Sequence, residues 1–218
     1  MQRLGAYAVF FAQNLDFEAE TVLLRILRGT SLTGLCGIRA FSDSGLHPLL
    51  GFRHRELAEY CQLMGVAYCH DSTNDDVAFA RNRVRHELLP YLEQHFNSNI
   101  KETLARLAQQ LVPEEELLEK QAFAAYVEAR LKTSVTAPNC TGNTALSPGE
   151  KVERLAFSAS TLMQQPPAIR RRVLREAYYS IAWAELDYER TLALEQLLVR
   201  RTGGKLVQLP GGVIAQYK

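Results

Sequence analysis

The chain has 218 residues, of which 47% are hydrophobic and 22% charged, a composition typical of a globular protein with a buried core. Its 25 Lys and Arg residues nearly balance its 24 Asp and Glu residues, so the net charge of +1 indicates no polyanionic partner and any nucleic-acid signal must come from local clusters. The four cysteines form no C-x-x-C pair, and no apolar run approaches the roughly 20 residues of a membrane span, so we expect a cytoplasmic protein without a structural zinc ion or a membrane partner.

The chain begins with the pattern of a βα unit. The run AYAVFFA at residues 6–12 is apolar throughout and rich in β-forming residues, which predicts a strand buried on both faces. A helix is expected from Asp16 to Arg28, with Asp16 as its cap and Gly29 ending it. A strand that leads into a helix through a short polar turn is typical of a parallel sheet, so this region is predicted to be α/β.

The α/β pattern continues to about residue 70. Short strands are predicted at residues 47–50 and 66–69, with a helix between them. A polar loop then leads into a helix that should end or bend at Pro90.

Beyond about residue 97 the pattern predicts helices alone, at 98–111 and 114–132. The segment 134–150 is small, polar and aperiodic, which indicates a flexible surface loop.

The last part of the chain carries clear start and stop signals. Pro167 should begin a helix, and Asp187 should cap another that runs to about Arg201. The sequence Pro-Gly-Gly at 210–212 lies between two short β-forming runs and predicts a small terminal hairpin.

The turn at residues 13–21 is the first candidate site, because ligands of open α/β sheets bind at the carboxyl ends of the strands. The backbone N–H groups of the following helix favour an anion such as a phosphate. Asp16 and Glu20 would suit a Mg²⁺ ion that bridges nucleotide phosphates. The alternative is that Asp16 only caps the helix and Glu20 faces solvent.

Two arginines at the end of the same helix form the second candidate. Arg25 and Arg28 lie near its C-terminus, where the helix dipole already favours cations. Gly29 and Gly34 would allow a mobile loop on which an arginine could meet substrate. A structural and a functional role are both open here.

The third candidate is a group of polar residues on the predicted helix before Pro90. Arg81 and Arg85 lie four residues apart on one helix face, where like charges repel by roughly 0.2 to 0.5 kcal/mol. Guanidinium groups suit bidentate phosphate binding, and Asn82 lies beside them. Asp75 and Asp76 stand too early in the chain to pair with both arginines. An anion site and a solvated charged face both stay open.

The fourth candidate is a basic cluster with neighbouring tyrosines in the helix after Pro167. It comprises Arg170, Arg171, Arg172 and Arg175, with Tyr178 and Tyr179 beside them. Such clustering suits an RNA backbone, although it would also suit the solvated face of a helix bundle.

Taken together, these segments resemble the tRNA(Ile)-lysidine synthetases, a family of N-type ATP pyrophosphatases with a PP-loop domain. QNLDFEAETVLLRILRGTSLTGL is similar to the family's H-H-x-D-D-Q-A-E-T-x-L-L-R-x-x-R-G-x-G-x-x-G-L stretch. HPLLGFRHRELAEY is similar to its R-P-L-L and R-x-E-L-x-x-Y segment, and DSTNDDVAFARNRVRHELLP to its D-x-S/T-N-x-D-x-x-x-x-R-N-x-x-R-x-x-L-L-P segment. The tail KLVQLPGGVIAQY resembles the end of the family's substrate domain.

The resemblance implies an α/β fold class in which residues 1–95 are the C-terminal portion of a parallel-sheet PP-loop ATP-binding domain. Residues 96–218 would form a mainly α-helical tRNA-binding domain with a small terminal β-hairpin. Because nothing in the chain resembles the S-G-G-x-D-S loop that cradles pyrophosphate, we expect the chain to start more than halfway through the ATP domain.

The resemblance also implies an ATP-dependent ligase. With ATP and Mg²⁺, such an enzyme adenylates the C2 oxygen of the wobble cytidine of tRNA(Ile) with a CAU anticodon, and free lysine then displaces AMP. On this basis Asp16 is the expected catalytic residue and Mg²⁺ ligand, and ATP would be bound by Asn14, Asp16, Arg28 and Gly29. The expected contacts with tRNA or phosphate are Arg81, Asn82, Arg85, Arg170, Arg171 and Arg175. A homodimer stays open.

Some residues depart from the family pattern at the predicted ATP site. Phe17 replaces the second Asp of D-D-Q, Glu18 replaces the Gln, and Gln13-Asn14 replaces the His pair. A benzyl group cannot hold a metal, so the second hypothesis is a catalytically inactive remnant that still binds tRNA. A third, a tRNA thiolation enzyme of the same superfamily, is disfavoured by the missing C-x-x-C pairs.

Overall fold

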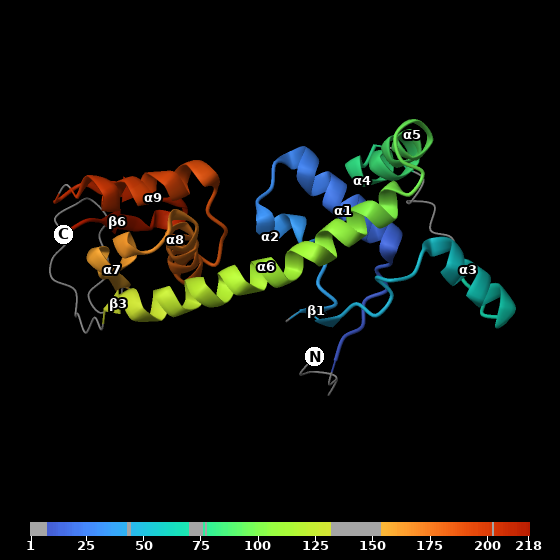
Figure 1. Ribbon diagram of the computed structural model, residues 1–218, viewed down its shortest axis with the longest axis horizontal. Helices are drawn as coiled ribbons and strands as arrows, with labels where there is room; N and C mark the ends of the chain where they lie inside the picture. Colours follow the sequence, from blue (N-terminus) through green and yellow to red (C-terminus); the bar gives the residue numbers. More distant parts are fainter. Residues whose placement is uncertain (1–7, 43–44, 70–75, 77, 132–153, 202) are drawn as a thin grey trace. The chain divides into compact units, whose positions relative to one another are not determined.

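The computed structural model describes residues 8–42, 45–69, 76, 78–131, 154–201 and 203–218 (Figure 1). The chain divides into two compact units, Met1–Glu116 and Leu117–Lys218. The predicted flexible loop at 134–150 lies outside the described residues. No helix in the described ranges is both long and apolar enough to cross a membrane.

Unit 1 is mostly helical. Its elements are α1 (Leu15–Arg28), α2 (Leu32–Leu35), the antiparallel pair β1 (Phe41–Ser42) and β2 (Gly45–Leu46), α3 (His54–Leu63), α4 (Ala80–Arg83), the π-helical turn η3 (Val84–Leu88), α5 (Leu89–His95) and the first part of α6 (Ile100–Ala129). The helix predicted from Asp16 to Arg28 is therefore present as α1. Its cap is Asn14, whose side-chain oxygen accepts the Phe17 N–H at 3.0 Å, and not Asp16.

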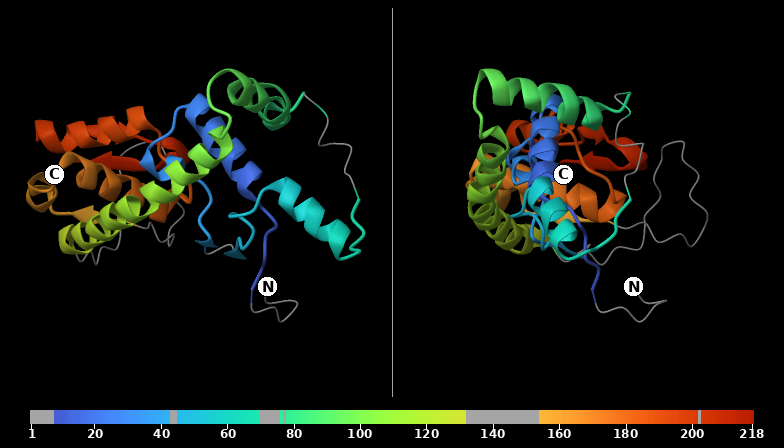
Figure 2. Two further views of the ribbon diagram at one scale, coloured as in Figure 1. Left: turned by 45° about the vertical axis from the view of Figure 1, so that its right-hand side comes forward. Right: turned by 90° about the vertical axis from the view of Figure 1, so that its right-hand side faces the viewer.

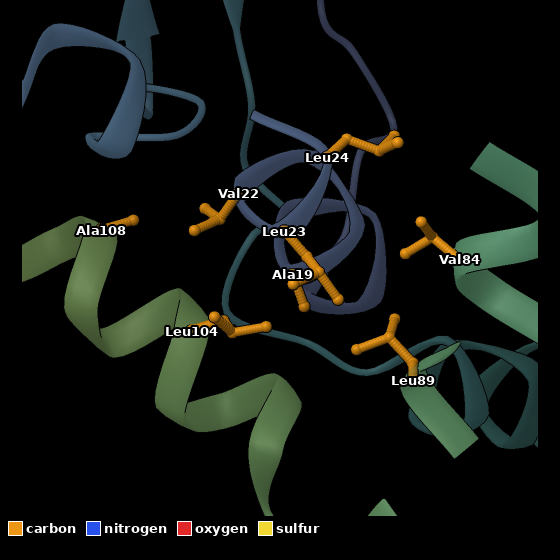
Figure 3. Packing of buried hydrophobic residues seen from close by; sticks show 8 residues of the cluster. All are labelled: Ala19, Val22, Leu23, Leu24, Val84, Leu89, Leu104 and Ala108. Atoms are coloured by element: carbon orange, nitrogen blue, oxygen red, sulfur yellow. The ribbon is translucent and has the colours of Figure 1, made fainter. Parts of the chain in front are cut away.

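The core of unit 1 is built around α1 (Figure 3). Apolar residues of α1 recur at helical spacing, so they form one buried face. That face packs against α6 on one side and against η3 and the start of α5 on the other. The cluster consists of Ala19, Val22, Leu23, Leu24, Val84, Leu89, Leu104 and Ala108. This packing brings the polar side chains of α1 close to those of α4 and η3.

The described part of the predicted first strand, residues 8–12, does not form a strand. Within the described residues 8–12 the only β-contact is an isolated parallel bridge between Phe10 and Leu46. The Phe11 N–H donates to Leu46 O at 2.8 Å, and the Leu46 N–H donates to Val9 O at 2.9 Å. Phe10 is 67% exposed, so a strand buried on both faces was wrong. A strand in the interior of a sheet needs partners on both edges, and the described residues contain no parallel sheet.

The two shorter predicted strands are also wrong. Residues 48–51 form a turn in which the Phe52 N–H donates to Leu49 O at 3.0 Å, and residues 66–69 are irregular and exposed. The helix between them is present as α3, but none of its residues is buried.

The helix that carries Arg81 does not stop at Pro90. It continues through η3, where the Leu89 N–H bonds to Val84 O, into α5 with Pro90 in its first turn. Because the helix is continuous here, Pro90 lies in its interior and one backbone hydrogen bond is not made at this position.

The helices predicted at 98–111 and 114–132 form one continuous helix, α6, with Pro113 inside it. Proline removes one backbone hydrogen bond from a helix interior. Ala105 and Ala108 before Pro113 and Ala122 and Ala125 after it are buried, so packing is available on both sides to offset that loss.

The structure of unit 2 confirms the helix starts at Pro167 and after Asp187 and the terminal hairpin that the sequence predicts. Its elements are the second part of α6, the antiparallel pair β3 (Arg130–Leu131) and β4 (Ala156–Phe157), α7 (Ala159–Gln164), α8 (Pro167–Ala182), α9 (Tyr188–Arg200), β5 (Leu206–Gln208), the 3₁₀ turn η4 (Pro210–Gly212) and β6 (Ile214–Gln216). Asp187 caps α9 by accepting the Arg190 N–H at 2.8 Å. The hairpin of β5 and β6 lies beside α8 and α9 (Figure 2).

Candidate functional site

The start of α1 holds the predicted catalytic residue in a network of protein contacts. Asp16 Oδ2 accepts the His54 N–H at 2.7 Å, and Asp16 Oδ1 lies 3.1 Å from Lys101 Nζ. Lys101 Nζ also lies 3.3 Å from Glu93 Oε1. Burial alone would raise the pKa of Asp16, but the His54 N–H and Lys101 outweigh it and hold that pKa below its usual value. Asp16 is therefore a carboxylate that joins α1 to α3 and α6.

These contacts bear on the predicted Mg²⁺ site. Both oxygens of Asp16 have protein partners, so a metal ion would have to displace Lys101. Among the residues that the structure describes, no three His, Cys, Asp or Glu side chains gather as metal ligands. The described residues alone therefore do not fit a magnesium ion. The metal and catalytic roles of Asp16, and the ATP contact of Asn14, stay predictions.

The segment after α1 is tied back to the helix by two charged side chains. Arg25 Nη1 donates to Gly34 O at 2.9 Å and to Gly37 O at 2.8 Å. The carboxylate of Glu18, which is 4% exposed, accepts the Ile38 N–H at 3.1 and 2.9 Å. Burial raises the pKa of Glu18 to about 7, although the Ile38 N–H and Arg25 act in the opposite direction. Arg25 thus has a structural role.

Gly29 and Arg28 end α1. Gly29 has φ +76°, in the region that favours glycine, and its N–H donates to Ile26 O at 3.1 Å. Arg28 is exposed and borders a shallow groove of about 310 Å³ between α1 and the α4–η3 segment. The groove is lined by Leu24, Leu27, Arg28, Ala80, Arg83, Val84, Glu87 and Leu88. Arg28 is thus open to a ligand, and its ATP contact, like that of Gly29, stays a prediction.

Arg85 forms a bidentate ion pair with a carboxylate of α1. Arg85 Nε lies 2.6 Å from Glu20 Oε1, and Nη2 lies 3.2 Å from Oε2. The Glu20 side chain is 1% exposed and that of Arg85 is 34% exposed. Glu20 therefore neither faces solvent nor is free for a metal. The pair also offsets the repulsion expected between Arg81 and Arg85, without any bound polyanion.

Arg81 is held differently. Its guanidinium carbon lies 4.0 Å from the centre of the Phe17 ring, and its Nη2 donates to Thr21 Oγ1 at 3.2 Å. Burial lowers the pKa of Arg81, and the positive charges of Arg85, Arg28 and Arg25 lower it further against the opposing effect of Glu20. The structure shows no ion pair for Arg81 within the described residues. Arg81 therefore combines several N–H donors with a local excess of positive charge, which suits an anion.

Asn82 positions the start of the same helix. It is 7% exposed, and its Nδ2 donates to the backbone oxygen of Asp76 at 2.8 Å. This contact accounts for a buried amide on α4, and contact of Asn82 with a phosphate stays a prediction.

In unit 2, the arginines of α8 share one carboxylate of α9. Arg170 Nη2 lies 2.6 Å and Nε 3.0 Å from Glu195 Oε1, while Arg171 Nε lies 2.7 Å from Oε2. Burial would raise the pKa of Glu195, but Arg171 and Arg170 outweigh it and lower that pKa. Arg170 is 8% exposed, so its pairing explains its place in the cluster without RNA. Arg175 is half-buried on α8, and the RNA contacts of all three arginines stay predictions.

The partners that hold these arginines lie far away in the sequence. Glu20 and Arg85 are 65 residues apart, and Arg170 and Glu195 are 25 residues apart. The available signal was chemical, since a glutamate at an otherwise apolar position of an amphipathic helix predicts a buried cation nearby. Glu20, between Ala19 and Val22, satisfies that pattern.

Comparison with known proteins assigns both ends of the chain. Residues 1–92 match the PP-loop domain, and residues 157–218 match the TilS substrate binding domain. The chain is therefore a PP-loop protein with a second, helical substrate-domain region.

Its relatives specify the family. A tRNA(Ile)-lysidine synthase of Thermus thermophilus is 36% identical over 217 residues, which is 100% of this chain and 37% of that protein. The corresponding protein of Geobacter sulfurreducens is 31% identical over 214 residues, which is 96% of this chain and 42% of that protein. The corresponding protein of a Nostoc species is 32% identical over 206 residues, which is 92% of this chain and 58% of that protein. The chain belongs to the tRNA(Ile)-lysidine synthetase family and spans about 37 to 58% of the length of these relatives.

Proposed function

We propose that the chain takes part in tRNA modification as a tRNA(Ile)-lysidine ligase, joining free lysine to C2 of the wobble cytidine of tRNA(Ile) with a CAU anticodon at the expense of ATP. The observation that carries this proposal is the similarity to lysidine synthases over 217 residues, which runs through both the PP-loop and the substrate-domain regions. In this proposal residues 1–95 contribute to ATP binding, residues 96–218 bind tRNA, and the protein works in the cytoplasm. A homodimer is an assembly that a sizing experiment would reveal.

Arg81 is the cation of unit 1 that we assign to a phosphate. It is packed on Phe17 and held by Thr21, so its guanidinium group is oriented before any ligand arrives. Its charge has no ion-pair partner among the described residues, whereas that of Arg85 is neutralised by Glu20. A preoriented guanidinium group binds phosphate oxygens with little loss of side-chain freedom. In this proposal Arg81 meets a phosphate of the tRNA, whereas Asn14, Arg28 and Gly29 line the ATP site.

A catalytically inactive, tRNA-binding protein is the second candidate, and two contacts favour it. Phe17 fills the position that carries a second carboxylate in the family motif, and Asp16 is bound to Lys101. Phe17 offers no metal ligand, and the carboxylates of Asp16 and Glu20 are paired with Lys101 and Arg85. Binding of tRNA would survive because the arginine contacts do not depend on a metal.

Lysine incorporation separates the two candidates. The full chain is incubated with unmodified tRNA(Ile), ATP, Mg²⁺ and labelled lysine, and tRNA binding is followed in parallel over a salt series. Label on the tRNA supports the ligase. Salt-sensitive binding without label supports the inactive protein, and the absence of both label and binding overturns both candidates.

The role of Arg81 is tested in the same binding assay. Arg81→Ala should weaken tRNA binding by about tenfold and reduce the slope of log affinity against log salt by about one. Arg83→Ala removes an equal charge from the same helix without touching Phe17, so it should have a smaller effect on both quantities. Equal effects of the two variants would show that only total charge matters.

A further inference from the structure

The exposed end of α8 carries two neighbouring aromatic side chains that no part of the proposed reaction uses. Tyr179 is 45% exposed and Trp183 is 79% exposed. Their ring centres lie 6.1 Å apart, with 57° between the ring planes. Large aromatic side chains so close together and so open to solvent are typical of a binding surface.

Two arginines extend this aromatic pair along the helix. Residues 172, 175 and 179 recur at spacings of three and four, so Arg172, Arg175 and Tyr179 lie along one face of α8. The ring of Trp183, just past the end of the helix, lies beside that of Tyr179. The buried residues Arg170, Val173 and Tyr178 lie on the other faces of the helix. We call the four residues 172, 175, 179 and 183 the α8 stripe.

The backbone at Trp183 supports a role in binding. Trp183 ends α8 with φ +51° and ψ +32°, a left-handed conformation, and its N–H donates to Tyr179 O at 2.9 Å. Glycine is the usual residue at such a helix end, because a side chain is strained there. Strain of this kind in a bulky, exposed residue points to a functional constraint.

We propose that the α8 stripe binds unpaired RNA, with a nucleobase stacked on Trp183 or Tyr179 and the flanking phosphates close to Arg172 and Arg175. This inference rests on the proposed function for the presence of RNA, and adds which part of unit 2 meets it. Aromatic rings beside cations match the alternation of bases and phosphates in a single strand, because every base has a face that can stack. A second copy of the chain fits less well, since it would bring the same arginines against each other.

The protein carries its own reporter for this contact. Trp183 is the single tryptophan of the chain, so intrinsic tryptophan fluorescence reports on it alone. The full chain is titrated with a short unpaired RNA oligonucleotide and, separately, with an abasic oligonucleotide of the same length. The unpaired RNA should quench the fluorescence, and the abasic strand, which has the same phosphates, should not.

Variants test whether the aromatic rings contribute to affinity. With a labelled oligonucleotide, Trp183→Ala should weaken binding by about tenfold, and Trp183→Phe should largely restore it. Tyr179→Ala should weaken binding to a smaller extent. Phe123→Ala is the matched control, because Phe123 is 67% exposed on α6 in the same unit, and its loss should leave affinity within twofold. Circular dichroism checks that each variant is folded.

The outcomes separate this inference from the proposed function. Salt-sensitive tRNA binding that neither quenches Trp183 nor responds to Trp183→Ala overturns the α8 stripe and leaves the ligase proposal intact. Quenching by unpaired RNA without lysine incorporation supports the stripe and removes the ligase. A fluorescence change that depends on protein concentration without RNA identifies a second copy as the occupant and overturns the inference.

Discussion

The two units each bury a glutamate against arginines from another helix, but the glutamates serve different numbers of arginines. In unit 2, Glu195 binds both Arg170 and Arg171. In unit 1, Glu20 binds Arg85, while Arg81 lies on an aromatic ring. The comparison teaches that a cluster of arginines in a sequence contains cations of two kinds. Those with a carboxylate on another helix hold the fold together, and those without one are open to an anion.

Loss of the shared carboxylate should have the largest effect on stability. Glu195→Ala leaves the buried Arg170 without a counter-ion, and breaking a buried pair in this way costs about 3 to 5 kcal/mol of unfolding free energy. Urea unfolding followed by Trp183 fluorescence measures the change in unit 2. Glu185→Ala, at an exposed position, should stay within about 0.5 kcal/mol of the unmodified protein. Similar results for the two variants would contradict a structural role for the pair.

The pair in unit 1 should contribute less, because Arg85 is partly exposed. Arg85→Ala leaves Glu20 buried, and the expected loss is about 2 to 3 kcal/mol. Unfolding followed by circular dichroism measures it, with the exposed Arg83→Ala as control. If Arg85→Ala lost no more stability than this control, Arg85 would belong with Arg81 among the cations open to a ligand.

Glu18 should make the stability of unit 1 depend on pH. Because burial raises the pKa of Glu18 to about 7 from its ordinary value of 4.5, the folded state binds more protons than the unfolded state between these values. The associated stability is fully present below about pH 4.5 and is lost as pH rises through about 7. We expect a decrease of about 2 kcal/mol from pH 5 to pH 8.

Denaturation curves at several pH values measure this dependence. Glu18→Gln keeps an oxygen that can accept the Ile38 N–H but cannot titrate, so it should flatten the dependence. Glu87→Gln, an exposed change in the same unit, should leave the dependence in place. An unchanged slope in Glu18→Gln would exclude this carboxyl as the cause.

The smallest effect concerns the contact between Arg81 and Phe17. A cation over an aromatic ring contributes about 0.5 to 1 kcal/mol at a partly exposed site. A double-mutant cycle with Phe17→Leu and Arg81→Gln should give a coupling energy of that size in unfolding experiments. Additive effects would show that the ring does not hold the guanidinium group, and would weaken the assignment of Arg81 to a phosphate.

The sequence predicted the elements whose signals are local. Pro167 begins α8 and Asp187 caps α9 because each acts through backbone groups within a few residues of itself. The terminal hairpin is likewise set by the turn at 210–212. The strand expected at 6–12 depended instead on neighbouring strands, and its described part forms a single β-bridge, to Leu46. Pro113 is accommodated by packing of α6, which residue preferences do not express.

In the candidate site, too, local features could be predicted from the sequence and tertiary contacts could not. The sequence placed Arg81 and Arg85 on one helix, but it could not assign them different partners, since Glu20 and Phe17 come from a helix about 65 residues earlier in the chain. Arg170 was predicted to contact RNA because its spacing in the sequence gives no sign of its partner on α9, Glu195. Charge and spacing located the cations, and only tertiary packing distinguished their roles.

The π-helical turn η3 sets the rotational phase between the arginines and the core. Because the Leu89 N–H reaches back to Val84 O, five residues earlier, the turn accommodates one residue more than a regular α-helix would. Deleting that extra residue would convert the turn into regular α-helix and leave Arg81 and Leu89 on the faces they now occupy. A deletion within α4 would instead rotate Arg81 by about 100° relative to Leu89 and remove it from the ring of Phe17. The turn is therefore a place where this helix could lose one residue while keeping both its core packing and the position of Arg81.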